Sequence, residues 1–218
     1  MANRAPVLAL VFDMDGVIIH SNPVHCEAWV LYNRRFGIET DDAMLGRMLG
    51  RRNDEIIRDF FGANVAVEKV AAHGAAKEAL YREIIGSRVS EALVPGVREF
   101  LARHQDVPIG LATNAEPANV EFLFERAGLR PFFRVVVDGH QVANPKPHPD
   151  VYLKAAELLG VAAANCVVFE DSHSGIQAAR SAGMRVVGVR TTHTELPGVD
   201  LEIDDFLSPA LEPWLAGR

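Results

Sequence analysis

Hydrophobic residues along the chain gather into short, continuous runs that are separated by longer amphipathic segments. Five runs are mostly apolar over four to six residues, at positions 7–12, 108–112, 133–137, 166–169 and 185–189. Continuous apolar runs of this length are typical of parallel strands that are covered on both faces. Their alternation with helical segments predicts an α/β fold with a doubly wound (Rossmann-like) parallel sheet.

Proline, serine and glycine mark the ends of the helical segments between the later runs. Helices are expected over 97–104 after Pro95-Gly96, from Pro117 to Gly128, from Pro149 to Gly160, and up to Gly183 after a cap at Ser172 or Ser174. These segments complete the alternation of strand and helix in the second half of the chain.

One stretch breaks this alternation. From Ile19 to about Leu93 no convincing strand pattern occurs, and helix signals follow one another instead. Helices are expected over 22–37, from a cap at Asn53 or Asp54 to Gly62, and over 67–85. An insertion of this length is too long for a loop. We therefore expect a small helical domain at 19–93, inserted into a core formed by residues 1–18 and 94–218.

Composition and charge narrow the class of protein. Hydrophobic residues make up 49% of the 218 residues and charged residues 23%, which is the balance of a globular chain. The net charge is −7 and no block of Lys or Arg occurs, so neither nucleic acid nor an anionic membrane is expected as a partner. No apolar run approaches the ~18 residues of a membrane span, and the first residues lack a signal-peptide pattern. With two distant cysteines, Cys26 and Cys166, we expect a soluble protein of the reducing cytoplasm.

Two aspartates follow the first apolar run directly, in Asp13-Met-Asp15-Gly. Residues two apart on an extended chain point the same way. Both carboxylates are therefore expected at the carboxyl end of the strand, where open parallel sheets bind ligands. An ordinary turn after the strand is the alternative for this motif alone. A calcium loop fits poorly because glycine is fourth rather than sixth, and the glycine patterns of nucleotide-binding loops do not occur.

Polar residues also follow the next three predicted strands. Thr113-Asn114 offers a hydroxyl and an amide that suit an oxyanion, although Asn114 alone is equally suited to cap the next helix. Lys146 lies among prolines that stiffen the backbone around it. Glu170-Asp171 follows the fourth strand. Four such motifs at the strand ends of one sheet indicate a common site rather than four unrelated loops.

Together these residues form a cluster of four carboxylates that faces one ammonium group. Carboxylates a few ångströms apart repel by roughly 4 kcal/mol per pair at an effective dielectric of 20, so a divalent cation is expected among them. Oxygen ligands without a His or Cys cluster favour Mg²⁺ over zinc. The arrangement suits phosphoryl transfer through an aspartyl-phosphate, because a carboxylate nucleophile and a phosphate are both anionic and need that cation.

These motifs resemble those of the haloacid dehalogenase superfamily, and most closely its β-phosphoglucomutase-like branch of small phosphatases and mutases. The match extends over nearly the whole chain, through Asp13-Met-Asp15-Gly-Val, Thr113-Asn114, Lys146-Pro and Glu170-Asp171-Ser172. The resemblance implies that Asp13 is the nucleophile, and that Asp15 protonates the leaving oxygen and then deprotonates the attacking water or hydroxyl. It also implies that Thr113 and Lys146 bind the transferred phosphoryl group, with Asn114 nearby.

The resemblance also implies metal ligands and a role for the insertion. Mg²⁺ would be bound by the Asp13 carboxylate, the Asp15 main-chain carbonyl and Asp171, with Glu170 as a direct or water-mediated ligand. Residues 19–93 resemble the family's helical cap, which closes over the site and excludes bulk water. Because such a cap shields the site without a second subunit, we expect a monomer. Dehalogenation is not expected, since the branch that performs it lacks the second acid.

Two features of the predicted cap resemble substrate contacts of the mutases. His25 lies where they carry a histidine beside the counterpart of Asp15, as some related phosphatases also do; a polar residue on the helix surface is the alternative. Lys77 and Tyr81 resemble a lysine–tyrosine pair that meets the sugar phosphate, or they form an ordinary i, i+4 pair on an exposed helix face.

The segment Gly50-Arg51-Arg52-Asn53 resembles the substrate loop of the cap. The mutase pattern places serine and arginine where Arg52 and Asn53 align, and a shift of one residue would restore the arginine. Arg52, or else Arg51, is therefore the candidate for binding a non-reacting phosphate, and a solvated run of charge is the alternative.

Glu116 departs from the mutase pattern, which has a lysine after the second motif. Because a carboxylate would repel the second phosphate of a bisphosphate intermediate, we expect a phosphatase that acts on a small phosphorylated metabolite similar to a sugar phosphate. A β-phosphoglucomutase, which returns the phosphoryl group to the sugar, is the alternative. A non-catalytic protein that binds a phosphorylated ligand is a more remote one, because every mechanistic position holds a competent residue.

Overall fold

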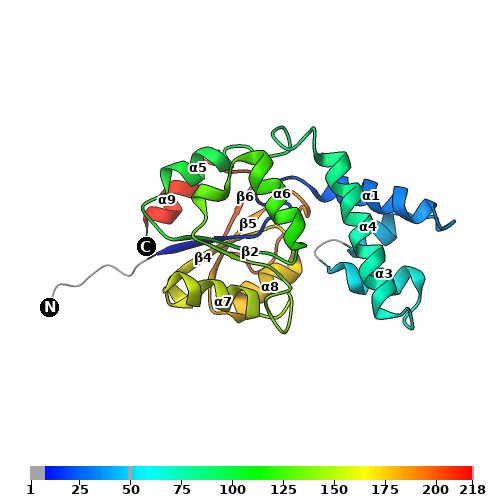
Figure 1. Ribbon diagram of the computed structural model, residues 1–218. Helices are drawn as coiled ribbons and strands as arrows, with labels where there is room; N and C mark the ends of the chain where they lie inside the picture. The colour runs from blue at the N-terminus through cyan, green and yellow to red at the C-terminus, as the bar shows by residue number, and fades with distance from the viewer. Residues whose placement is uncertain (1–7, 49–50, 218) are drawn as a thin grey trace.

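A six-stranded parallel sheet forms the centre of the fold (Figure 1). The computed structural model describes residues 8–48 and 51–217. In spatial order the strands are β3-β2-β1-β4-β5-β6. Their bounds are Ala9–Phe12 for β1, Ile109–Ala112 for β2, Val135–Val137 for β3, Cys166–Glu170 for β4, Arg185–Val189 for β5 and Leu201–Ile203 for β6.

The order of the strands reverses at β1. This strand pairs with β2 on one side and with β4 on the other, so that Leu10 is in register with both Ile109 and Val167. The connections on the two sides diverge at the carboxyl end of β1 and leave a crevice, which is where open parallel sheets bind ligands. The predicted α/β fold with a doubly wound parallel sheet is confirmed.

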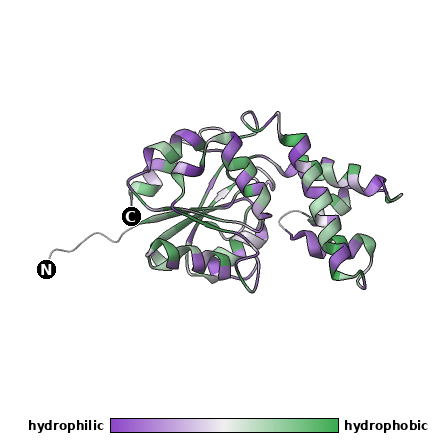
Figure 2. Cartoon of the chain, viewed as in Figure 1, coloured by the Kyte–Doolittle hydropathy of each residue, from purple (hydrophilic) through white to green (hydrophobic). Residues whose placement is uncertain are grey.

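Helices cover both faces of the sheet, which is why its strands are apolar on both sides. One face carries α7 (Asp150–Leu159) and α8 (His173–Ser181); the other carries α5 (Val97–Arg103), α6 (Pro117–Ala127) and α9 (Leu211–Ala216) (Figure 1). Short 3-10 turns at Arg130–Phe132 and Ala163–Asn165 precede β3 and β4. In Figure 2, hydrophobic residues dominate the strands, while the helices mix hydrophobic and hydrophilic residues along their length.

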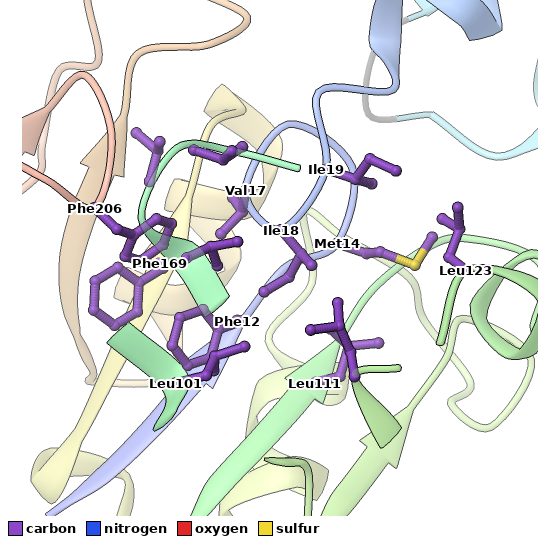
Figure 3. Packing of buried hydrophobic residues seen from close by; sticks show 14 of the residues in the cluster. Phe12, Met14, Val17, Ile18, Ile19, Leu101, Leu111, Leu123, Phe169 and Phe206 are labelled. Atoms are coloured by element: carbon purple, nitrogen blue, oxygen red, sulfur yellow. The ribbon is translucent and has the colours of Figure 1, made fainter. Parts of the chain in front are cut away.

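Phenylalanine rings form the centre of the larger core. Phe12 of β1 stacks on Phe169 of β4 with ring centroids 4.6 Å apart, and Phe206 lies close to both rings (Figure 3). All three side chains are buried. Phe12 directly precedes Asp13 and Phe169 directly precedes Glu170. Close packing of these rings therefore holds the two strand ends that carry the acidic residues.

Among the described residues, four helices are inserted between β1 and α5: α1 (Asn22–Arg34), α2 (Asp42–Met48), α3 (Asn53–Phe61) and α4 (Val67–Ile85). In Figure 1 they lie beyond the carboxyl ends of the strands, and we refer to them as the helical insertion. The chain leaves and re-enters the core side by side, because Ile19 and Leu93 form an antiparallel bridge.

Hydrophobic side chains divide the helical insertion into an inner and an outer part. Tyr81 and Ile85 of α4 join the core cluster above the sheet. A separate outer cluster is formed by Trp29, Tyr32, Met48, Ile56, Ile57 and Val70. The inner part is thus continuous with the core, and the outer part has its own small core.

The structure differs from the expected elements at a few places, each with a local cause. The first strand begins at Ala9, and Val7 lies outside the described residues. The sequence does not predict β6 or α2, because three alternating residues and seven residues of mixed polarity give no clear period. The predicted cap at Asn53 or Asp54 is wrong: Arg52 precedes α3 without a side-chain cap, and the Asn53 amide donates to Glu78.

The serine cap of α8 is confirmed. Ser172 Oγ accepts a 3.1 Å hydrogen bond from the main-chain N–H of Gly175. In the part of the chain that the structure describes, no helix combines the length and the apolar character needed to cross a membrane.

Candidate active site

Asp13, which follows β1, is a buried carboxyl held between the main chain and a lysine. Its main-chain N–H donates to the carbonyl of Phe169 at 3.0 Å, which continues the ladder between β1 and β4. Its Oδ1 accepts a 2.6 Å hydrogen bond from Lys146 Nζ. Burial raises the pKa of Asp13 to about 7, although Lys146 acts in the opposite direction.

Glu170, the last residue of β4, is enclosed by hydrogen-bond donors. Its Oε1 accepts hydrogen bonds from Lys146 Nζ at 2.7 Å and from the Tyr152 hydroxyl at 2.8 Å. Its Oε2 accepts from the main-chain N–H groups of Asp171 and Ser172, each at 2.9 Å. Burial would raise the pKa of Glu170, but Lys146 and these hydrogen bonds outweigh it and lower the pKa. The carboxylate is therefore ionised and holds Lys146 in place.

Asp171 lies against the turn that follows β1. Its Oδ2 accepts hydrogen bonds from Asn22 Nδ2, at 3.2 Å, and from the Thr192 hydroxyl. A Cβ atom at Gly16 would lie 1.9 Å from this oxygen, and Gly16 has a φ of +83°. Only glycine allows both the approach and this backbone conformation. Burial, reinforced by the neighbouring negative charges, raises the pKa of Asp171 well above its usual value.

The three carboxyl groups form a cluster whose negative charge is compensated only in part, by one lysine. Asp13, Glu170 and Asp171 each offer one oxygen, and these oxygens all lie within 4.8 Å of one another. Among the described residues, Lys146 is the one cation that forms ion pairs with this cluster. The pKa of Asp171 is raised because burial disfavours its ionised form and too little positive charge lies nearby to offset this effect. A divalent cation would correct the balance, and an all-oxygen donor set fits Mg²⁺.

The loop after β2 positions the segment that carries Lys146. The Lys146 N–H donates to Asn114 Oδ1 at 3.2 Å, and Asn114 Nδ2 donates to the Lys146 carbonyl at 3.5 Å. Thr113 is buried, and its Oγ1 accepts from the Ala115 N–H at 3.1 Å. Asn114 thus joins two loops through the main chain, and the threonine hydroxyl tightens its own turn.

Asp15 is partly buried where the core meets the helical insertion. Its Oδ1 accepts a 2.5 Å hydrogen bond from the Ser21 hydroxyl and lies 3.4 Å from His25 Nε2. The His25 ring stacks on Tyr81 with centroids 3.8 Å apart and planes 4° from parallel. Burial would raise the pKa of Asp15, but His25 and Ser21 outweigh it and lower the pKa. Asp15 is therefore held ionised beside an oriented histidine.

Lys77 and Tyr81 lie one turn apart on α4, and both contact His25. Lys77 Nζ lies 2.8 Å from His25 Nδ1 and 5.0 Å from the centre of the Trp29 ring. The exposed fraction is 1% for Lys77 and 0% for Tyr81. The alternative of a pair on an exposed helix face is therefore wrong, because both side chains support the histidine from inside.

A second pair on α4 contacts the core and is not anticipated by the sequence analysis. Asn119 of α6 donates from Nδ2 to Glu78 Oε2 at 2.6 Å and accepts at Oδ1 from Arg82 Nη1 at 2.7 Å. Burial would raise the pKa of Glu78, but Lys77 and His25 outweigh it and lower the pKa to about 2. The i, i+4 spacing of Glu78 and Arg82 is the one sequence signal that both face a common partner.

Comparison with known proteins identifies the family. A family model described as haloacid dehalogenase-like hydrolase matches residues 7–183, which is most of the chain. The chain belongs to the haloacid dehalogenase-like hydrolases. It is therefore an enzyme of this family, and the family identified from the motifs is confirmed.

Relatives of this hydrolase include both phosphatases and mutases. The chain is 35% identical over 183 residues to the fructose-1-phosphate phosphatase YqaB of Escherichia coli, covering 83% of this chain and 95% of that protein. It is 32% identical over 213 residues to the β-phosphoglucomutase of Bacillus subtilis, covering 94% and 92%. The β-phosphoglucomutase structure from Clostridium difficile has a TM-score of 0.86 at 26% identity and covers 96% of each chain.

The two arginines of the predicted substrate loop have different surroundings in this hydrolase. Arg51 lines the cavity above Asp13, and its guanidinium forms ion pairs with Glu55 at 3.1 Å and Asp59 at 2.8 Å. Arg52 instead forms an ion pair with Asp54 at 3.2 Å and does not line the cavity. Gly50, at the start of the same loop, lies outside the described residues.

One cavity between the sheet and the helical insertion brings the other predicted site residues together. Its lining includes Asp13, Asp15, His25, Lys77, Thr113, Asn114, Lys146, Glu170 and Asp171. Asn53, Glu78, Glu116 and Asn119 also line it. The strand ends supply the acidic floor, and α1, α3 and α4 supply the opposite wall.

Proposed function

We propose that this protein is a Mg²⁺-dependent phosphohydrolase that acts on a small phosphorylated metabolite, similar to a sugar phosphate, through an aspartyl-phosphate intermediate. The observation that carries the proposal is the contact of Lys146 Nζ with both Asp13 and Glu170 inside a buried carboxylate cluster. This arrangement supplies fixed positive charge where a phosphoryl group would meet a carboxylate nucleophile. Similarity to a fructose-1-phosphate phosphatase supports the class of substrate.

In the first half of the proposed reaction, a carboxylate oxygen of Asp13 attacks phosphorus. The new oxygen–phosphorus bond forms as the bond from phosphorus to the ester oxygen breaks. Asp15, which is ionised in the free protein, has to take up a proton from solvent before this step and then gives it to the departing oxygen. In the second half, Asp15 takes a proton from water as the water attacks phosphorus, and inorganic phosphate leaves. The lowered pKa of Asp15 favours the ionised form that this second half needs.

Asp13, Asp171 and the Asp15 main-chain carbonyl would hold Mg²⁺. Because both oxygens of Glu170 already accept hydrogen bonds, we propose that Glu170 contributes through a water molecule. The cation would neutralise the negative charge that the nucleophile and the phosphate share. Lys146 and Thr113 would bind the phosphoryl oxygens.

Asn114 would act on the phosphoryl group indirectly. Its side chain is hydrogen-bonded to the main chain of Lys146, so its proposed role is to position that lysine rather than to contact the substrate.

The helical insertion would act as a cap with bounds at residues 19–93, over a core of residues 1–18 and 94–218. His25, supported by Lys77 and Tyr81, would orient Asp15. Arg51 is a better candidate than Arg52 for facing the substrate, because it lines the cavity. A closed cap would exclude bulk water from Asp13. Because the core and the helical insertion of one chain together line this cavity, we propose that a monomer suffices as the working unit.

Glu116 supports hydrolysis rather than return of the phosphoryl group to a sugar. Its carboxylate lines the cavity and lies 2.9 Å from His140 Nε2. A mutase has to bind a bisphosphate here, and negative charge on the wall opposes the second phosphate. The mutase remains the alternative because of the similarity to the B. subtilis enzyme.

The test is ³¹P NMR of the purified protein with Mg²⁺ and two esters, fructose 1-phosphate and β-glucose 1-phosphate, the latter with a trace of glucose 1,6-bisphosphate. We expect inorganic phosphate to accumulate, and the Asp13→Asn variant to be slower by on the order of 10³-fold or more because it lacks the nucleophile. Asp106→Asn, at an exposed position, is the matched control and should retain the wild-type rate.

Two other outcomes have defined meanings. Conversion of β-glucose 1-phosphate to glucose 6-phosphate would assign the mutase. Full activity of Asp13→Asn would contradict the aspartyl-phosphate mechanism.

A further inference from the structure

Each positively charged side chain that lines the cavity, within the described part of the chain, is already paired with a carboxylate. These side chains are Arg51, Lys77 and Lys146. Lys146 contacts Asp13 at 2.6 Å and Glu170 at 2.7 Å. Its charge is therefore used at the acidic floor of the cavity, where the reacting phosphate would bind.

The other two cations belong to the wall formed by the helical insertion. Lys77 Nζ lies 2.8 Å from a Glu78 carboxylate oxygen, so this buried pair carries no net charge. Arg51 lies between Glu55, at 3.1 Å, and Asp59, at 2.8 Å. One guanidinium thus faces two carboxylates. Neither site offers uncompensated positive charge to a second anion.

Several other side chains of this wall are uncharged. Asn53 lines the cavity, and its amide is fixed by a 2.7 Å hydrogen bond to Glu78. Trp29, Met48 and Ile56 add buried apolar surface to the same lining. An amide beside aromatic and aliphatic surface suits the hydroxyl groups and C–H faces of a carbohydrate.

The core side of the cavity adds negative charge. Glu116 lies just before α6, lines the cavity and has its carboxylate 2.9 Å from His140 Nε2. A second phosphate that approached this wall would meet a carboxylate of like charge, which disfavours binding.

From this pairing of charges we infer that the cavity recognises phosphate monoesters whose remaining part is uncharged, such as a sugar or polyol, and that it discriminates against bisphosphates. The inference rests on the proposed function, which puts the reacting phosphate at Asp13. A second phosphate would have to compete with two carboxylates for Arg51 or approach Glu116. The cavity would therefore select monophosphates in two ways: its uncharged side chains contact the sugar favourably, and its carboxylates repel the second phosphate of a bisphosphate.

Equilibrium binding to the Asp13→Asn variant tests the inference without any turnover. Isothermal titration calorimetry in Mg²⁺ buffer would use two matched pairs, fructose 1-phosphate with fructose 1,6-bisphosphate, and glucose 1-phosphate with glucose 1,6-bisphosphate. For whichever sugar binds, we expect its bisphosphate to bind at least about tenfold more weakly than its monophosphate. Equal or tighter binding of the bisphosphate would overturn the inference, as would no binding of any of the four esters.

A charge-reversal variant shows whether the local wall is responsible. In the Asp13→Asn background, Glu116→Lys should tighten bisphosphate binding by about tenfold and change monophosphate binding far less. Glu121→Lys is the matched control, because it makes the same charge change at an exposed position of α6, the helix that Glu116 precedes. An equal gain in both variants would overturn the inference, since net charge and not the cavity wall would then explain it.

The outcomes for binding and for hydrolysis are separable. If wild-type protein releases no phosphate while the Asp13→Asn variant still prefers monophosphates, the proposed hydrolysis fails and the binding inference stands. If the wild-type protein releases phosphate but bisphosphates bind as well as monophosphates, the proposed hydrolysis stands and the binding inference fails.

Discussion

In the absence of a metal ion, the buried environment of Asp13 disfavours the ionised form of its carboxyl group. Burial raises its pKa from 3.8 to about 7, and Lys146 offsets only part of that effect. Between these two pH values the folded protein keeps a proton that the unfolded chain has lost. The contribution of Asp13 to folding stability therefore falls as the pH rises through this window. A cation bound by the carboxylate would remove the penalty, so protons and metal compete for the same group.

This competition predicts how Mg²⁺ binding depends on pH. With a pKa of about 7, Asp13 is mostly protonated at pH 6 and mostly ionised at pH 8. We expect Mg²⁺ to bind at least about tenfold more weakly at pH 6, and to raise the melting temperature less there. Calorimetric titration at the two pH values measures the difference, and Asp13→Asn should show a smaller one. Equal affinity at both pH values in the wild type would contradict the prediction.

Residues at strand ends are the part of the site that the sequence predicts best. Asp13 and Glu170 each follow an apolar run directly, and a parallel sheet brings the carboxyl ends of its strands to one edge. Loop side chains are less predictable, because their partners depend on how the loop folds. Asn114 binds the main chain of Lys146, and Arg52 forms an ion pair with its neighbour Asp54. The first contact joins residues far apart in the sequence, and the second competes with the role in substrate binding that the loop pattern predicts for Arg52.

At the scale of elements, α4 connects the helical insertion to the rest of the site through two adjacent stripes. Lys77 and Tyr81 form one stripe and support a histidine of α1. Glu78 and Arg82 form the other and hold the two ends of the Asn119 amide on α6. Since neighbouring residues form the two stripes, the contact with α6 and the orientation of the histidine are mechanically linked.

Removing the amide tests this connection. In Asn119→Ala, two charged groups lose their hydrogen bonds, and each such bond contributes about 1.5–3 kcal/mol. We expect the free energy of unfolding to fall by at least the contribution of one such bond. We also expect KM to rise, because the helical insertion is held less firmly. Urea denaturation and steady-state kinetics measure the two effects.

Asn33→Ala provides the control for loss of a buried amide. Asn33 is also fully buried, but its side chain donates to Thr40 within the helical insertion. It should lower stability by roughly 1 kcal/mol and leave KM unchanged. Equal effects of the two variants on KM would argue against the role of Asn119.

Long or strongly patterned elements are predictable from the sequence, and short ones are not. The range expected for β5 matches the observed strand, and 67–85 matches α4, because each has a clear apolar pattern. β6 has three residues and depends on pairing with β5 for its definition. The predicted cap of α3 is wrong because the Asn53 amide binds Glu78, far along the chain, rather than the first turn of its own helix.

At the scale of the whole molecule, the division of apolar clusters predicts unequal local stability. The core clusters enclose both faces of the sheet, whereas the outer part of the helical insertion relies on its own small cluster. Regions with fewer buried contacts open at lower free energy than the core. We therefore expect the backbone amides of α3 to exchange with solvent before those of β1 and β4.

Ile57→Ala would separate the two regions further. Ile57 is fully buried in the outer cluster, and truncation of such a residue costs about 2–5 kcal/mol. Hydrogen exchange should accelerate in α3 and the outer half of α4, while β1 and β4 keep their protection. Val167→Ala, in a buried position of β4, is the comparison and should affect the sheet. Uniform acceleration in Ile57→Ala would contradict separate stability.

The bridge between Ile19 and Leu93 has an evolutionary consequence. Because the chain departs and returns at one point and the outer part of the helical insertion has its own cluster, that outer part can lengthen or shorten without altering the pairing of β1 with its neighbours. If the proposed function is right, the residues that react with phosphate lie outside this junction, and residues that face the rest of the substrate lie within it. A chimaera in which a foreign segment replaces the outer part of the helical insertion should therefore keep the original acidic floor.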